Sequence, residues 1–186
     1  MRRLRKPALA LACLLLLFLP GCVVMSVQPF YTGKDLVFDK ELLGTWKYED
    51  KEDTLLFRKA PDDSYFIVSY EDGKAAIYRA YLFELLKTRY FDVTQIMPED
   101  AKDTGHFIGV HTIWKVEMDG DTIRIVGINE AKLKDILRDK PMPWADPDYK
   151  GDVLLTGTTE EIQDFLKRNP TDLFEDEGGV WKREKP

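Results

Sequence analysis

The residue types that most often carry catalysis or bind metal are scarce in this 186-residue chain. Histidine occurs only at His106 and His111. Their odd offset would place them on opposite faces of one strand, so they cannot easily share a metal ion from there. His111 lies in an apolar run, and we expect it to be a core or rim residue that makes one hydrogen bond.

Serine and acidic residues give no stronger signal. The serines after residue 22 are Ser26, Ser64 and Ser69, and none stands in Gly-x-Ser-x-Gly. The segment from Asp146 begins like a calcium loop, but its twelfth position is Gly157 instead of a bidentate acid. A Ser-His-Asp triad or a carboxylate pair built from distant residues stays open. We expect a protein that is not an enzyme and has no metal or cofactor, with a hydrolase as the least favoured alternative.

Cysteine is the other residue type with distinctive chemistry. Cys22 ends the apolar run 14–22, which is shorter than the roughly 20 residues that a membrane span needs. A basic start precedes the run, as in a secretory signal, and consists of Arg2, Arg3, Arg5 and Lys6. The ending Leu-x-Gly-Cys resembles the lipobox of bacterial lipoproteins. That resemblance implies cleavage before Cys22, a thioether-linked diacylglycerol on its sulfur and acylation of its new amino group. An ordinary signal peptide with a chance cysteine is the alternative.

The resemblance also implies a location. Residues 1–21 would be the removed signal peptide, and Cys22 would hold the protein on the periplasmic face of the cell membrane. Because Val23 is not acidic, we expect the outer membrane if the host has one. With Cys13 lost and the Cys22 thiol alkylated, the mature domain would have no free thiol or disulfide, so its apolar core would carry the stability alone.

The net charge of the chain limits the classes of binding partner that we expect. The chain has 27 basic and 33 acidic side chains, and the leader holds four of the basic ones, so the remainder is near −10. A balance that acidic argues against nucleic-acid binding and against a polybasic grip on anionic lipid. The link to the membrane is therefore expected to be the lipid itself.

Strand signals dominate the chain from residue 43 onward. Asp72-Gly73 and Asp119-Gly120 predict tight hairpins between neighbouring strands. Many short strands joined by tight turns predict an antiparallel barrel or sandwich. The expected strands are 43–48, 54–59, 64–70, 75–86, 90–96, 107–118, 122–128, 153–156 and 179–183.

Two short helices are expected to interrupt the strands and to pack on them. Asn129 can cap a helix over 130–138, and Thr158 and Glu161 stand at capping-box spacing before a helix over 160–167. Each would bury one apolar stripe, formed by Leu133, Ile136 and Leu137 in the first and by Ile162, Phe165 and Leu166 in the second. Before the strands, residues 22–41 are interpreted as a lipidated tether whose second half lies across the domain, and 42–186 as the barrel domain.

The segment Leu43-Gly44-Thr45-Trp46 resembles the Gly-x-Trp opening of lipocalin-like (calycin) barrels. The resemblance implies a mainly β fold, an antiparallel barrel of seven to nine strands. It also implies that Trp46 closes the barrel floor and that a basic residue of the last strand covers its ring. Arg183 stands at that position, and a one-residue slip would hand the role to Lys182. A Trp simply packed in a core is the alternative. The helix over 130–138 departs from the simplest lipocalin plan and leaves the strand order open.

Aromatic residues are frequent on these strands, and a closed eight-strand barrel can enclose one small ligand. The candidate ligand-binding residues are Tyr65, Tyr78, His111 and Trp114. The leading hypothesis is a non-catalytic, lipid-anchored envelope lipoprotein that binds a small apolar or amphipathic ligand. The alternative is an adaptor with a filled barrel that docks another envelope protein. A cavity lined by aromatic residues would favour the first, and a filled barrel with an exposed apolar patch the second.

Overall fold

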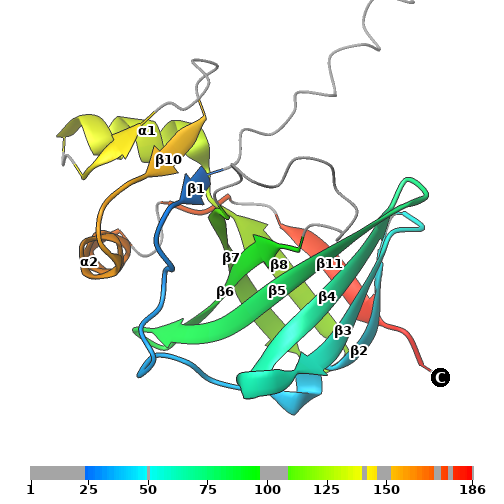
Figure 1. The fold of residues 1–186 in the computed structure, drawn as a ribbon. Coiled ribbons are helices and arrows are strands. Elements are labelled where there is room, and N and C mark those ends of the chain that lie inside the picture. The colour runs from blue at the N-terminus through cyan, green and yellow to red at the C-terminus, as the bar shows by residue number, and fades with distance from the viewer. Residues whose placement is uncertain are drawn as a thin grey trace, which may run out of the picture.

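The computed structural model describes residues 24–49, 51–96, 109–139, 142–145, 152–169, 173–175 and 178–185. Eight antiparallel strands form a barrel, which closes because β11 pairs with both β2 and β8 while β6 pairs with β7 (Figure 1). The predicted mainly β fold with an antiparallel barrel is therefore confirmed. The barrel strands are β2 (Gly44–Tyr48), β3 (Thr54–Ala60), β4 (Ser64–Glu71), β5 (Lys74–Leu85), β6 (Thr88–Gln95), β7 (His111–Asp119), β8 (Thr122–Gly127) and β11 (Gly179–Arg183).

Two-residue turns join several of these strands. Asp72 and Gly73 both have positive φ, at 48° and 74°, which is the geometry of the type I′ turns that match the twist of hairpin strands. Gly120 has φ 55° in the second predicted hairpin. Leu86 and Lys87 form a third such turn with φ of 50° and 65°, although neither is a residue type that favours this region.

Between β8 and β11 the chain leaves the barrel. This insertion contains α1 (Glu130–Asp139), β9 (Trp144–Ala145), β10 (Val153–Leu155) and α2 (Thr159–Arg168). Both helices begin where the capping signals predict. The Asn129 side chain accepts the Lys132 amide at 2.9 Å, and Thr158 and Glu161 form the reciprocal capping box.

Two apolar clusters lie on the two sides of the barrel wall. The inner cluster lies inside the barrel and includes Trp46 and Phe91. The outer cluster joins the outward side chains of β5 to β8 to both helices, and Leu133, Ile162 and Phe165 are buried in it. Because residues of a strand alternate between its faces, Tyr90 enters the outer cluster and Phe91 the inner one. The helices thus pack on the outside of the barrel, as predicted.

The packed domain begins earlier than the sequence indicates. β1 (Val24–Ser26) lies between β7 and β10, so it belongs to the sheet instead of a tether. Phe30 is fully buried, and the Val37 amide donates to the Leu82 carbonyl at 2.9 Å. A short 3-10 helix, η1 (Lys40–Leu42), leads into β2. This segment contains only a three-residue strand and irregular backbone that is held by distant partners. Such a segment has no sequence periodicity, so the sequence does not show that it is part of the packed domain. In the part of the chain described, no helix has the length and apolar character needed to cross a membrane.

Candidate functional site

One end of the barrel is closed by a packed floor. The Trp46 ring is fully buried there, and its Nε1 donates to the Leu42 carbonyl at 2.9 Å. The Arg183 guanidinium lies over this ring and donates to the carbonyls of Leu43, at 2.9 Å, and Glu41. Three elements that are distant in sequence, η1, β2 and β11, therefore meet at the floor. Lys182 points to the opposite face and pairs with Glu49.

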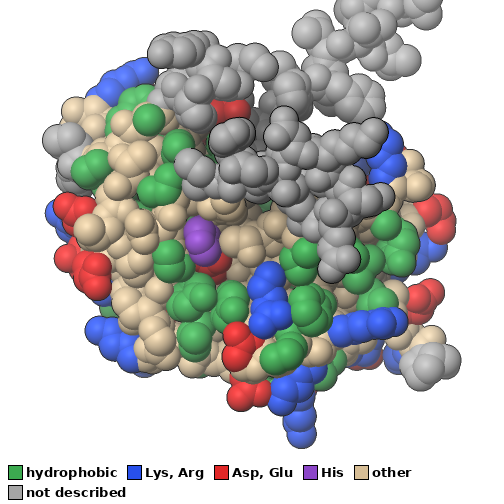
Figure 2. Space-filling view, viewed as in Figure 1, with side chains coloured by type: hydrophobic (Ala, Val, Ile, Leu, Met, Phe, Trp, Pro, Cys, Tyr) green, Lys and Arg blue, Asp and Glu red, His purple; other side chains and the backbone are tan. Residues whose placement is uncertain are grey.

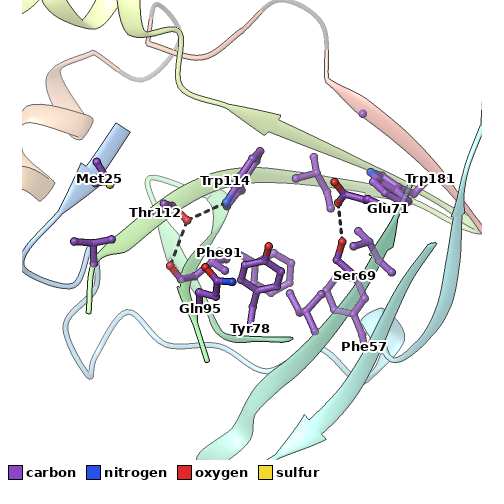
Figure 3. A pocket seen from close by; sticks show the side chains of 16 residues that line it. Met25, Phe57, Ser69, Glu71, Tyr78, Phe91, Gln95, Thr112, Trp114 and Trp181 are labelled. Carbon is purple, nitrogen blue, oxygen red and sulfur yellow. Dashed lines mark hydrogen bonds between the residues drawn. The ribbon is translucent and has the colours of Figure 1, made fainter. Parts of the chain in front are cut away.

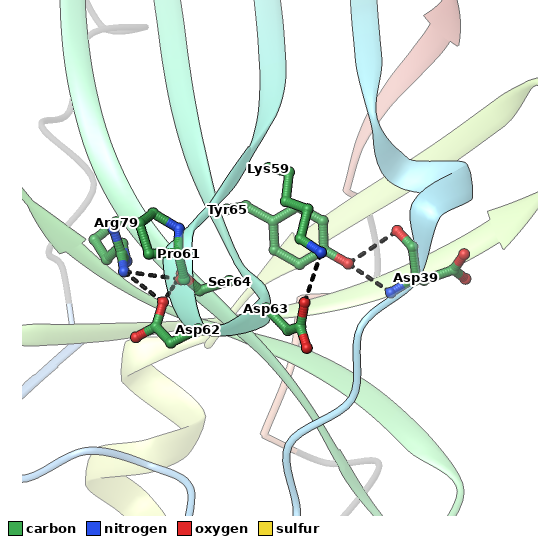
Figure 4. A network of polar contacts seen from close by, with 8 residues as sticks. All are labelled: Asp39, Lys59, Pro61, Asp62, Asp63, Ser64, Tyr65 and Arg79. Atoms are coloured by element: carbon green, nitrogen blue, oxygen red, sulfur yellow. Dashed lines mark hydrogen bonds and ion pairs between the residues drawn. The ribbon is translucent and has the colours of Figure 1, made fainter.

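Tyr65 belongs to this floor and not to a ligand site. Its side chain is fully buried, and its hydroxyl donates to the Asp39 carbonyl at 2.9 Å and accepts the Asp39 amide at 2.7 Å (Figure 4). Burial raises the pKa of Tyr65 to about 12. Tyr65 is not among the residues that line the cavity described below, because its register on β4 places it among the packed residues of the floor.

Beside Tyr65, an ion-pair network holds the turn between β3 and β4. Arg79 donates to Asp62 at 2.6 Å and to the Pro61 carbonyl at 3.2 Å, while Lys59 pairs with Asp63 at 2.8 Å (Figure 4). Both aspartates have positive φ, at 62° and 51°, so the turn carries backbone strain that these contacts offset. The network is structural and lies at the floor end.

The other half of the barrel contains a cavity of about 530 Å³ (Figure 3). Tyr78 and Trp114, two of the sequence-predicted ligand residues, line it. The lining residues come from every barrel strand except β2, and also from β1. They are Met25, Leu55, Phe57, Ile67, Ser69, Glu71, Tyr78, Phe91, Val93, Gln95, Val110, Thr112, Trp114, Ile125, Gly179 and Trp181.

A few polar groups stand in this apolar lining. The Ser69 hydroxyl donates to the Glu71 carboxylate at 2.7 Å, and Trp114 Nε1 donates to the Thr112 hydroxyl at 3.2 Å (Figure 3). Burial and the Glu71 charge raise the pKa of Tyr78, which stays a neutral hydrogen-bonding phenol. Among the lining residues Glu71 is the one carboxylic acid, and none is Lys or Arg. Mostly apolar walls with a few polar groups are typical of a site for a small amphipathic molecule.

His111 does not reach this cavity. It points to the outer face of β7, and its Nδ1 forms a hydrogen bond of 2.7 Å with Asp92. Asp92 is fully buried and also accepts the Phe30 amide at 2.8 Å, so this pair fastens the N-terminal segment to the barrel. The imidazole, purple in Figure 2, reaches the surface with about a fifth of its area exposed. His111 is therefore not among the residues that line the cavity, and its position is that of a rim histidine with one hydrogen bond.

The Asp92–His111 pair contains two of the three groups of a hydrolase triad. Ser26 lies opposite His111 in the β1–β7 register. Its hydroxyl donates to the Gln28 carbonyl at 2.7 Å, and it is fully buried. Ser64 donates to the Pro61 carbonyl at the floor. Among the described residues no serine hydroxyl donates to the histidine, and the Asp92–His111 hydrogen bond joins β6 to β7.

Asp92 and Glu71 are not among the site residues that were predicted from the sequence. Asp92 follows Tyr90 by two positions and so shares its buried outer face, an unusual place for a carboxylate. The two-residue spacing between Tyr90 and Asp92 can be read from the sequence and could have identified this carboxylate. Cys22, His106, Asp146 and Asp148 lie outside the described residues. Among the residues that the structure describes, no group of three or more His, Cys, Asp or Glu side chains could hold a metal ion.

Comparison of the chain with protein-family models, curated proteins and solved structures finds no match.

Proposed function

We propose that this chain is a non-catalytic lipoprotein of the bacterial cell envelope whose barrel binds one small apolar or amphipathic ligand. The cavity of about 530 Å³ supports this proposal most directly. Sites for small molecules usually have volumes of about 300–1,000 Å³ and enclose most of the ligand surface. The favourable free energy of binding would come from burying the apolar part of the ligand against rings such as Phe91 and Trp114.

The division of the barrel into two halves favours a ligand over a purely structural core. The floor half is packed by Trp46, Tyr65 and their neighbours, so it supplies the stability. The other half contains a cavity, although the strands around it carry large side chains that could have filled it. Unfilled apolar space lowers stability, by about 24 cal/mol for each Å³ in cores that do not relax. An adaptor with a filled barrel would have no use for such a cavity.

The expected lipid on Cys22 would determine where the protein lies in the cell. In this proposal the protein stays at the periplasmic face of a membrane, in the outer membrane where the host has one. Cys22→Ser tests the anchor by cell fractionation: the variant should lose the mature size and leave the membrane fraction. Unchanged maturation and membrane association would contradict the lipoprotein part of the proposal.

Native mass spectrometry of residues 22–186, purified without lipidation, tests the binding part. We expect a bound mass in the range of small amphiphiles that is lost after extraction with organic solvent. An empty domain that also fails to bind any added amphiphile would contradict the proposal, and a co-purifying protein would favour the adaptor.

A further inference from the structure

The segment that would carry the lipid joins the barrel at the cavity and not at the floor. β1 pairs with β7 through Met25 and Thr112, and both residues line the cavity. Met25 is three positions after Cys22, and an extended chain spans at most about 11 Å over that distance. The C-terminal end lies at the floor, where the Glu184 amide donates to the Thr45 carbonyl. An anchor at Cys22 therefore holds the cavity end of the barrel close to the membrane.

Exposed apolar side chains gather at the same end. Seven large apolar side chains are exposed among the described residues, and Leu86, in the β5–β6 turn, marks the floor end. Five of the seven belong to the cavity half or to the strands attached there, namely Tyr70, Ile77, Ile96, Trp114 and Trp144. Figure 2 shows how apolar patches alternate with charged ones on the side in view. Of these five, Trp114 also lines the cavity, and exposed apolar side chains at this end suit contact with a bilayer better than contact with water.

Trp144 is the most specific of these residues. It is 42% exposed and lies on β9, opposite Leu155 of β10, which in turn pairs with Ser26 of β1. Two strand spacings separate it from β1, about 10 Å. Tryptophan is enriched at the interface between membrane and water because its ring is apolar and its N–H is polar. An exposed indole therefore lies within reach of the surface to which Cys22 would be anchored.

We propose that the barrel stands with its cavity facing the membrane and that it takes up an amphiphile from that bilayer. This inference rests on the proposed function, because it concerns the same cavity and adds the source of the ligand. An amphiphile that enters from the aqueous phase must first expose its hydrocarbon part to water. A cavity held against the bilayer shortens that exposure, so uptake is fast even when the free concentration of the ligand is very low.

The experiment uses the cysteine that the mature chain already has. Residues 22–186 contain Cys22 alone, since the other cysteine, Cys13, lies in the leader. The protein is joined by a disulfide to a thiol-reactive lipid in phosphatidylcholine vesicles that hold a dansyl-labelled single-chain amphiphile. Reductant releases the protein at chosen times, and the released protein is assayed for bound amphiphile. The comparison protein is the C22S/K185C variant, which is attached at position 185, where the parent protein has the exposed Lys185 at the floor end.

We expect the chain attached through Cys22 to load several times faster than the chain attached through position 185. Both proteins should bind the same amphiphile equally well when it is supplied in solution without vesicles. Equal loading rates from the bilayer, or faster loading through position 185, would overturn the inference and leave the proposed function standing. If neither protein binds the amphiphile in solution, the proposed function fails and the inference fails with it.

Discussion

Arg183 lies directly opposite Trp46 in the β11–β2 pair, and its guanidinium carbon is 4.2 Å from the centre of the indole ring. The same guanidinium donates to the Leu43 carbonyl, so it joins β11 to the segment just before β2. A shielded cation–π contact contributes about 0.5–2 kcal/mol. The pair therefore closes the barrel at the point where its two ends meet.

Arg183→Ala should lower the free energy of unfolding by about 1–3 kcal/mol, because it removes the ring contact and the hydrogen bonds that the guanidinium donates to the carbonyls of Leu43 and Glu41. Urea titration measures the change. A double-mutant cycle with Trp46→Phe should give a coupling energy above about 0.5 kcal/mol, since the residues are in contact. Lys182→Ala, on the outer face of the same strand, is the matched control. Strictly additive effects of the two changes would show that the contact contributes nothing.

Phe165→Ala should destabilise the domain by about 3–5 kcal/mol, the usual cost of removing a buried Phe side chain. Phe165 is only 3% exposed and lies between α2 and the outer wall of the barrel. Glu160→Ala, on the exposed face of the same helix, should change stability by less than about 0.5 kcal/mol. Similar unfolding curves for the two variants would mean that α2 does not pack on the barrel.

Local signals explain why most of the fold is predictable. The hairpin at Asp72-Gly73 and the capping box at Thr158 depend on neighbours within four residues, and both form as expected. β1 escapes prediction because its three residues gain their conformation from β7 and β10, which are remote in sequence. The contact between Arg183 and Trp46 was expected from the resemblance to lipocalin-like barrels, while membership of that family stays a prediction.

The pH dependence of stability should report on Tyr65. Its pKa is about 12 in the folded protein against an ordinary value of 10.0, because burial disfavours the phenolate. The folded state then keeps a proton that the unfolded state loses, so this contribution is complete below about pH 10 and is lost as the pH rises toward 12. Tyr65→Phe should flatten the fall in unfolding free energy over that range. A slope unchanged from the parent protein would contradict the assignment.

Glu71 should influence which head group the cavity accepts. Glu71→Gln should weaken binding of an alkyltrimethylammonium and strengthen binding of an alkyl sulfate of the same chain length. Each effect should be below about tenfold, because exposed ion pairs contribute about 0.2–1 kcal/mol. Calorimetric titration measures both affinities. Glu160→Gln removes the same charge far from the cavity and should change neither; equal effects of the two variants would indicate a response to net charge alone.

The candidate site is less predictable than the fold, for a geometric reason. His111 and Trp114 differ by three positions, so they face opposite sides of β7 and cannot line one cavity. That conflict is visible in the sequence. Tyr65 and Tyr78 both face inward, and only the register of β4 and β5 places one in the floor and the other in the cavity. Depth along a barrel depends on the pairing of whole strands, which alternation within one strand does not reveal.

Filling the cavity tests the central claim most directly. Val93 lines the cavity, whereas Val68 faces outward on β4, so Val93→Trp should occupy the cavity and Val68→Trp should leave it open. Thermal unfolding establishes that both variants fold, and titration with a neutral alkyl glycoside measures binding. The account predicts that Val68→Trp binds like the parent protein and that Val93→Trp binds at least ten times more weakly, a loss of about 1.4 kcal/mol or more. Equal binding by a folded Val93→Trp variant would contradict the claim that the ligand lies inside the barrel.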